Sequence, residues 1–170
     1  MSVSLLESVQ VVARTAGAVA LAHYRTALTV ESKGDGSPVT VADREAERAA
    51  RAWLAERFPA DGILGEEFGA TAGTSGRRWL LDPIDGTKSF VRGVPLWGTL
   101  VAVVEGERVL AGAACFPAVD ELLAAAPGLS HARGRPRRGS RRGGSPPAPP
   151  QGAGGRTRAP CRRTSPSRAA

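Results

Sequence analysis

The apolar residues at the start of the chain recur at the spacing of an α-helix. One stripe predicts a helix over residues 5–24, and it consists of Leu5, Leu6, Val9, Val12, Ala13, Ala16, Val19 and Ala20. A second stripe predicts a helix that begins between Thr40 and Asp43, and it consists of Ala46, Ala50, Trp53, Leu54 and Phe58. The turn-rich sequence "SKGDGSPVT" separates the two helices.

Short apolar runs bounded by turn residues follow the second helix. "GILGEE" and "RWLLD" have the length and composition of strands that end in acidic residues. "GTLVAVVEGERVLAGAACF" predicts two strands joined by a tight turn near Gly106, and "ELLAAA" predicts another strand before Pro127. Helices followed by hairpin-linked strands favour an α+β fold, with two helices packed on an antiparallel sheet.

The composition changes abruptly after residue 128, which we take as the end of the folded domain. Residues 129–170 consist mainly of Arg, Pro, Gly, Ser and Ala, with almost no large apolar side chain. Such a segment buries too little surface to offset its chain entropy, so we expect it to be disordered.

The positive charge of the protein lies in this second segment. The formal net charge is +7, but residues 131–170 hold eleven arginines and no acidic residue, so residues 1–130 are mildly acidic. One explanation is a basic tail that binds RNA or DNA through phosphate contacts. The other, which we favour, is a frameshifted reading of GC-rich coding DNA, because the tail has no aromatic residue on which bases could stack.

Features of the chain outside these elements favour a cytoplasmic protein that does not associate with membranes. No uninterrupted apolar run reaches the roughly 18 to 20 residues that span a bilayer. The first residues have no basic segment typical of a secretory signal. Two cysteines, Cys115 and Cys161, form neither a disulfide framework nor a zinc motif.

The sequence "WLLDPIDGTKSF" contains the strongest candidate for chemistry. Residues three apart in a strand point to opposite faces, so Asp82 and Asp85 converge only if the chain turns at Pro83. Two carboxylates and the carbonyl of Ile84 would then offer hard oxygen ligands, which suit Mg²⁺ or Mn²⁺. Gly86 and the residue after it would open a helix whose free N–H groups face an anion.

Each acidic residue also has an ordinary structural interpretation. Asp-Gly is a common turn, and Asp43 at the predicted start of a helix is typical of an N-cap. Glu66 and Glu67 would usually be solvated, but they follow an apolar strand and could reach the same sheet edge as Asp82.

Taken together, residues 5–128 resemble the N-terminal part of the inositol monophosphatase family of Mg²⁺-dependent, lithium-sensitive phosphomonoesterases. The resemblance rests on "DGSPVTVAD", "ILGEE", "WLLDPIDGTKSF" and the strand pair that follows, in the order of the family. "DPIDGTKSFVRGVPLW" is most similar to the histidinol-phosphatase branch, which acts in histidine biosynthesis. Related activities left open are those of inositol-1-monophosphatase and fructose-1,6-bisphosphatase.

The resemblance implies a Mg²⁺ site. Glu66 would be a ligand, Asp82 would bridge two ions, the Ile84 carbonyl would join the first ion and Asp85 would bind the second. A small phosphorylated metabolite would be the substrate.

The resemblance also implies how water and substrate are bound. Thr87, oriented by Asp43, would polarise the attacking water, and the N–H groups of Gly86 and Thr87 would bind the phosphate. The substrate contacts implied are Glu66, Asp85, Gly86, Thr87 and Lys33.

The chain departs from the family in its second half. The family has a further domain with a Trp-Asp motif whose aspartate completes the second metal site, whereas this sequence contains no Trp-Asp pair. We therefore expect a truncated family fold without the C-terminal domain, and an inactive chain is one alternative. A homodimer is expected only if the full fold is present, and a degraded gene product without function is a further alternative.

Overall fold

The structure, a computed structural model, describes residues 4–27, 29–32 and 38–133. Its elements in chain order are α1 (Leu5–His23), β1 (Glu31–Ser32), β2 (Pro38–Val39), α2 (Val41–Arg57), β3 (Gly62–Gly65), β4 (Gly69–Thr71), β5 (Arg77–Asp85), α3 (Thr87–Val91), β6 (Gly98–Glu105), β7 (Arg108–Phe116), the 3₁₀ turn η1 (Pro117–Val119), β8 (Glu121–Ala126) and β9 (Leu129–Arg133).

Both long helices begin with a reciprocal capping arrangement, which explains why they start where they do. In α1 the hydroxyl of Ser4 accepts from Glu7 N at 3.2 Å, and Ser4 N donates to Glu7 Oε2 at 3.0 Å. In α2 the N-cap is Thr40, and Asp43 is the third helical residue that bonds back to it. Two orphan N–H groups are satisfied at each start.

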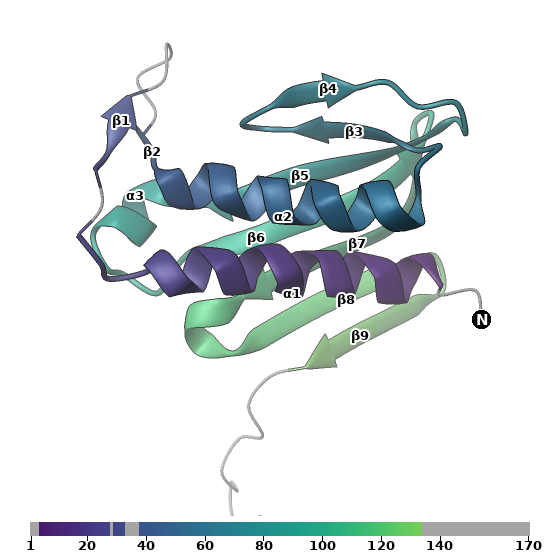
Figure 1. The fold of residues 1–170 in the computed structure, drawn as a ribbon. Coiled ribbons are helices and arrows are strands. Elements are labelled where there is room, and N and C mark those ends of the chain that lie inside the picture. Colours follow the sequence, from purple (N-terminus) through teal and green to yellow (C-terminus); the bar gives the residue numbers. More distant parts are fainter. Residues whose placement is uncertain (1–3, 28, 33–37, 134–170) are drawn as a thin grey trace, which may run out of the picture. The chain divides into compact units, whose positions relative to one another are not determined.

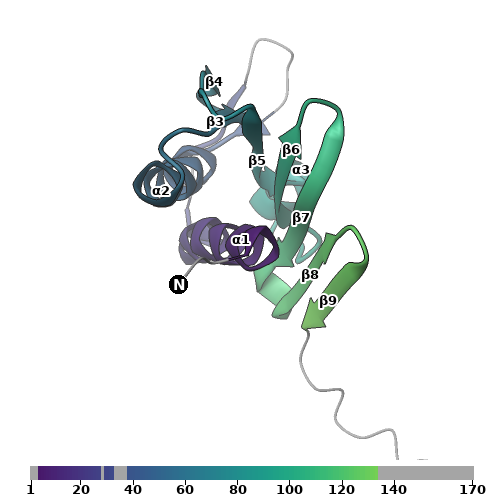
Figure 2. The same cartoon turned by 90° about the vertical axis from the view of Figure 1, so that its right-hand side faces the viewer.

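The two helices lie side by side on one face of the main sheet (Figures 1 and 2). The buried stripe of α1 contains Val9, Val12, Ala13, Ala16 and Ala20, all at most 1% exposed. In the part of the chain that is described, α1 is also the one helix long and apolar enough to cross a membrane by length and composition. Packing against α2 and the sheet accounts for its apolar face.

The main sheet has seven strands in the order β4-β3-β5-β6-β7-β8-β9, and β1 and β2 form a separate two-stranded sheet. The strands from β5 to β9 follow one another as an antiparallel meander. The two helices on a layered α+β sheet confirm the predicted fold class. One pair differs from the antiparallel expectation: β3 and β5 run parallel, with Gly65 beside Leu81.

The sheet continues beyond the predicted domain end at residue 128. Gly128, with φ +77°, lies in the tight turn between β8 and β9, and β9 pairs with β8 as far as Arg133. The predicted boundary therefore falls inside a hairpin. The tail interpretation for residues 134–170 lies outside the described residues.

The two faces of the sheet differ in burial. Trp79 and Val103 point toward the helices and are 0% exposed, whereas Leu64 on the opposite face is 41% exposed. Leu80 and Leu100 share this opposite face and are half-buried. The candidate chemistry lies at the end of β5 on this same outer face.

Candidate functional site

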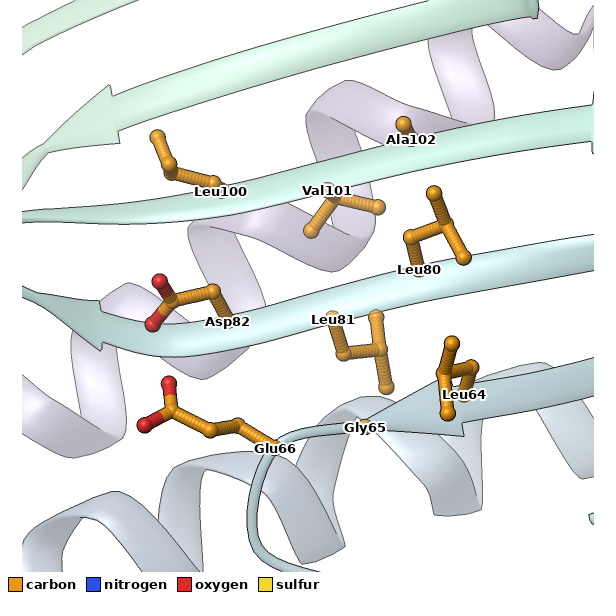
Figure 3. A pocket seen from close by; sticks show the side chains of 9 residues that line it. All are labelled: Leu64, Gly65, Glu66, Leu80, Leu81, Asp82, Leu100, Val101 and Ala102. Carbon is orange, nitrogen blue, oxygen red and sulfur yellow. The ribbon is translucent and has the colours of Figure 1, made fainter. Parts of the chain in front are cut away.

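The parallel pairing of β3 with β5 brings the first two acidic groups together. Both strands run in the same direction, so their carboxyl ends meet at one edge of the sheet. Glu66 directly follows β3, and its N–H donates to Leu81 O at 3.2 Å. Figure 3 shows the carboxylates of Glu66 and Asp82 pointing toward each other. The prediction that "GEE" reaches the same sheet edge as Asp82 is confirmed.

A β-bulge brings Asp85 to the same side. Asp82 pairs with Leu100 and Asp85 with Gly98, so three steps along β5 match two steps along β6. Leu100 and Gly98 are two apart and share a face, and the extra residue in β5 therefore places both aspartates on that face. The two carboxylates do converge, through one inserted residue within a continuing strand.

The carboxyl group of Asp82 is held in an environment that disfavours its charge. Burial, the negative charge and hydrogen bond of Glu66, and the charge of Asp85 raise the pKa of Asp82 to about 7. A hydrogen bond from the backbone of Ile84 acts in the opposite direction. Among the described residues, Asp82 Oδ1 is buried without a hydrogen-bond partner. A cation at this carboxylate would satisfy the oxygen and neutralise the repulsion.

An apolar depression of about 410 Å³ adjoins this carboxylate pair (Figure 3). Side chains from three strands line it, among them Leu64, Leu80 and Leu100. The depression therefore places the acidic pair beside a surface of low polarity, which strengthens electrostatic interactions at its edge.

The segment after β5 turns sharply into a short helix. Gly86 is the N-cap of α3 with φ 86° and ψ 36°, and a Cβ there would lie 3.0 Å from Leu96 O. Only glycine fits this left-handed, closely packed position without strain. The prediction that Gly86 and Thr87 open a helix is confirmed, with α3 beginning at Thr87.

The hydroxyl of Thr87 is oriented by the backbone of the preceding strand, β5. Thr87 Oγ1 donates to Ile84 O at 3.0 Å. The single hydroxyl proton is thereby committed, and the oxygen keeps its lone pairs to accept from a water. The structure therefore ties Thr87 to Ile84, and the orientation by Asp43 that the resemblance implied stays a prediction.

Asp43 lies within the first turn of α2 and is not its N-cap. It is the buried third residue of α2, and its Oδ2 accepts from Thr40 N at 2.8 Å and from Thr40 Oγ1 at 2.7 Å. The N-cap interpretation of Asp43 is therefore corrected to Thr40. The helix α3, which begins at Thr87, contacts β2. Since β2 directly precedes α2, Asp43 and Thr87 belong to neighbouring segments. Lys33 lies outside the described residues.

The fit of these groups to a divalent cation rests on the chemistry of the donors. Within the described ranges, no three His, Cys, Asp or Glu side chains already form a cluster of metal-binding geometry. Glu66 and Asp82 nevertheless present facing carboxylates with one buried oxygen unsatisfied, and Asp85 shares their face. Hard oxygen donors of this kind fit Mg²⁺.

Sequence reasoning did not single out Glu47, although this residue binds the backbone directly after Glu66. It is 0% exposed and contacts the turn that carries Glu66. The available signal was its i,i+4 spacing with Arg51, a pattern that is usually a solvated ion pair on a helix surface. Asp61 was missed as well, and it is the buried acceptor for Ser75, Arg77 and Trp79.

Solved structures contain the same arrangement of helices and sheet. The extragenic suppressor protein suhB from Bartonella henselae matches with a TM-score of 0.71 and 31% identity, over 79% of this chain and 53% of that chain. The likeness shows that the chain has the fold of this structure over about half of its length. The inositol monophosphatase family profile matches residues 3–147, and the chain belongs to this family.

Curated relatives add a finer likeness. The histidinol-phosphatase of Chlorobaculum parvum is 49% identical over 115 residues, covering 66% of this chain and 44% of the relative. The histidinol-phosphatase of Mycobacterium tuberculosis is 46% identical over 101 residues, covering 59% of this chain and 39% of the relative. The chain thus spans less than half the length of these two relatives.

Proposed function

We propose that the chain provides the metal- and phosphate-binding part of a Mg²⁺-dependent phosphomonoesterase of the histidinol-phosphatase type. The observation that carries the proposal is the facing pair of Glu66 and Asp82, with the buried Oδ1 of Asp82 unsatisfied. The identity to two histidinol-phosphatases supports histidinol phosphate as the substrate.

In this proposal the donors for the metal come from two strands. Glu66, Asp82 and the carbonyl of Ile84 hold one Mg²⁺, and Asp85 helps to hold a second. When bound, Mg²⁺ supplies positive charge for the phosphoryl group and lowers the pKa of a coordinated water. Repulsion between Glu66 and Asp82 makes this site selective for a cation, because an empty site leaves like charges in contact.

The remaining groups bind water and phosphate. Thr87 donates its proton to Ile84 O, so its oxygen accepts a hydrogen bond from the attacking water and aligns it. The N–H groups of Gly86 and Thr87 lie at the start of α3 and bind phosphate oxygens. These groups orient the water and the phosphate and neutralise charge, which are the main requirements of phosphoryl transfer.

The test is phosphate release by the full 170-residue chain with Mg²⁺, from histidinol phosphate, inositol 1-phosphate and fructose 1,6-bisphosphate. We expect histidinol phosphate to be hydrolysed fastest, and Asp82→Asn and Thr87→Ala each to abolish the activity. Hydrolysis that survives in both variants would overturn the site. A chain that neither hydrolyses these esters nor binds Mn²⁺ would overturn the function.

A second candidate function rests on the arginine-rich segment. Eleven arginines without an acidic residue in positions 131–170 favour binding of RNA or DNA through phosphates. Deleting residues 134–170 should then remove binding and its steep dependence on salt. Absence of salt-sensitive binding by the full chain would exclude this function.

A further inference from the structure

The side chain of Glu47 connects α2 to the turn that contains Glu66. Its carboxylate is 0% exposed and accepts from Glu67 N at 2.7 Å and from Phe68 N at 3.3 Å. Arg51, one turn further along α2, donates from Nε to Glu47 Oε1 at 2.7 Å. A buried carboxylate on a helix therefore binds the backbone directly after the candidate metal ligand.

Gly65 allows this close approach. A Cβ built at Gly65 would lie 1.9 Å from Glu47 Oε1, a distance that no real side chain could adopt. The carboxylate therefore occupies the space beside the last residue of β3. Glu47 therefore lies against the backbone on both sides of Glu66.

Arg51 holds the other side of the same hairpin. Its Nη1 donates to Thr71 Oγ1 at 2.9 Å, and its Nη2 donates to Gly69 O at 2.5 Å. The guanidinium also lies 5.9 Å from the ring centre of Phe68. Together Glu47 and Arg51 bind the turn from Glu67 to Thr71 through both its N–H groups and its oxygens.

We infer that Glu47 is a positioning residue, which fixes the Glu66 carboxylate opposite Asp82 by binding the N–H groups of Glu67 and Phe68. The inference rests on the proposed function, because it assigns Glu66 as a metal ligand. Hydrogen bonds to residues around metal ligands commonly contribute 10- to 100-fold to metal affinity. Glu47 performs this task through the backbone and does not itself contact the metal.

The variant that tests the inference is Glu47→Gln. Glutamine keeps the size of the side chain, but its amide nitrogen cannot accept from a backbone N–H or from Arg51. We expect Mn²⁺ affinity, measured by electron paramagnetic resonance on the full chain, to fall by about 10- to 100-fold. Amide hydrogen exchange at Glu67 and Phe68 should become faster.

Asp61→Asn provides the matched control. Asp61 is also a buried carboxylate paired with an arginine, but it binds Ser75, Arg77 and Trp79 at the opposite end of β3. This variant should lose stability while it keeps Mn²⁺ affinity. Equal losses of affinity in Asp61→Asn and Glu47→Gln would show a general loss of stability and overturn the positioning role.

Two outcomes separate this inference from the proposed function. Unchanged exchange at Glu67 and Phe68 in Glu47→Gln overturns the positioning role, whether or not metal binds. If the wild-type chain does not bind Mn²⁺, or if Asp82→Asn does not change the Mn²⁺ affinity, the proposed metal site is overturned instead.

Discussion

Glu66, directly after β3, and Asp82 on β5 present their carboxylates to each other, and burial together with the charge of Glu66 raises the pKa of Asp82 to about 7. Their proximity follows from strand direction, because the ends of β3 and β5 lie at the same sheet edge. In the folded chain without metal, the carboxylates of Glu66 and Asp82 therefore repel each other, and a bound proton or cation reduces this repulsion.

The first prediction concerns the pH dependence of stability. The folded-state pKa of Asp82 lies near 7, above the value of 3.8 for an unperturbed aspartate. The folded chain binds one more proton than the unfolded chain between about pH 4 and pH 7, so this contribution to the free energy of unfolding falls as pH rises through that window. Urea unfolding in EDTA at several pH values measures the slope.

The same measurement on Asp82→Asn provides the control for this slope. In this variant the contribution of residue 82 to the pH dependence of the free energy of unfolding should vanish, because asparagine does not titrate. Asp61, whose pKa is lowered although burial acts to raise it, influences stability only below this window. Identical slopes for wild type and Asp82→Asn would contradict the assignment.

The second prediction concerns stability at pH 8 without metal. Asp82→Asn removes a partly buried charge that faces Glu66, so we expect the free energy of unfolding to increase by about 1–2 kcal/mol. Addition of Mg²⁺ should stabilise the wild type and leave the variant unchanged, since only a chain that binds the ion gains from it. Thermal unfolding with and without Mg²⁺ decides this, and equal responses would contradict it.

The third prediction concerns the turn into α3. Gly86 and Gly106 both have positive φ, but only Gly86 has backbone close to its missing Cβ. Gly106→Ala should cost about 1 kcal/mol for the left-handed conformation alone. Gly86→Ala should cost about 2–3 kcal/mol, because contact with Leu96 O is added to that conformation. Chemical denaturation of both variants tests this order, and equal costs would show that the contact relaxes freely.

The fourth prediction concerns the outer face of the sheet. Leu64 is 41% exposed beside the apolar depression, so Leu64→Gln should reduce self-association while changing the free energy of unfolding by less than about 1 kcal/mol. Light scattering at increasing protein concentration measures the association. Val103→Ser, at a position that is 0% exposed, should instead destabilise by about 2–4 kcal/mol. Unchanged scattering of Leu64→Gln would show that this face does not associate.

Local patterns were sufficient to predict the two long helices and the main strands. Apolar residues at helical spacing marked the buried face of α1, and runs of apolar residues bounded by glycine marked β6 and β7. The acidic residues Glu66 and Asp82 were also recognisable, since each comes directly after or near the end of a short apolar run. These features depend on neighbours in the sequence, which is why the sequence was informative.

Features that depend on distant partners could not be predicted in this way. The parallel pairing of β3 with β5 is set by tertiary packing. Pro83 did predict a break between Asp82 and Asp85, but the form of that break, a bulge within a continuing strand, depends on the pairing with β6. Glu47 lies in a charged helix segment, "REAER", that is typical of a solvated face. Its burial becomes apparent only when the turn after β3 is placed against α2.

The contact between Gly65 and Glu47 has a consequence for how this segment can evolve. A side chain at position 65 and a carboxylate at position 47 compete for the same volume. Homologues should therefore covary at these two positions, and a homologue with alanine in place of Gly65 should have a shorter residue in place of Glu47. The pair constrains which substitutions can accumulate, and in which order.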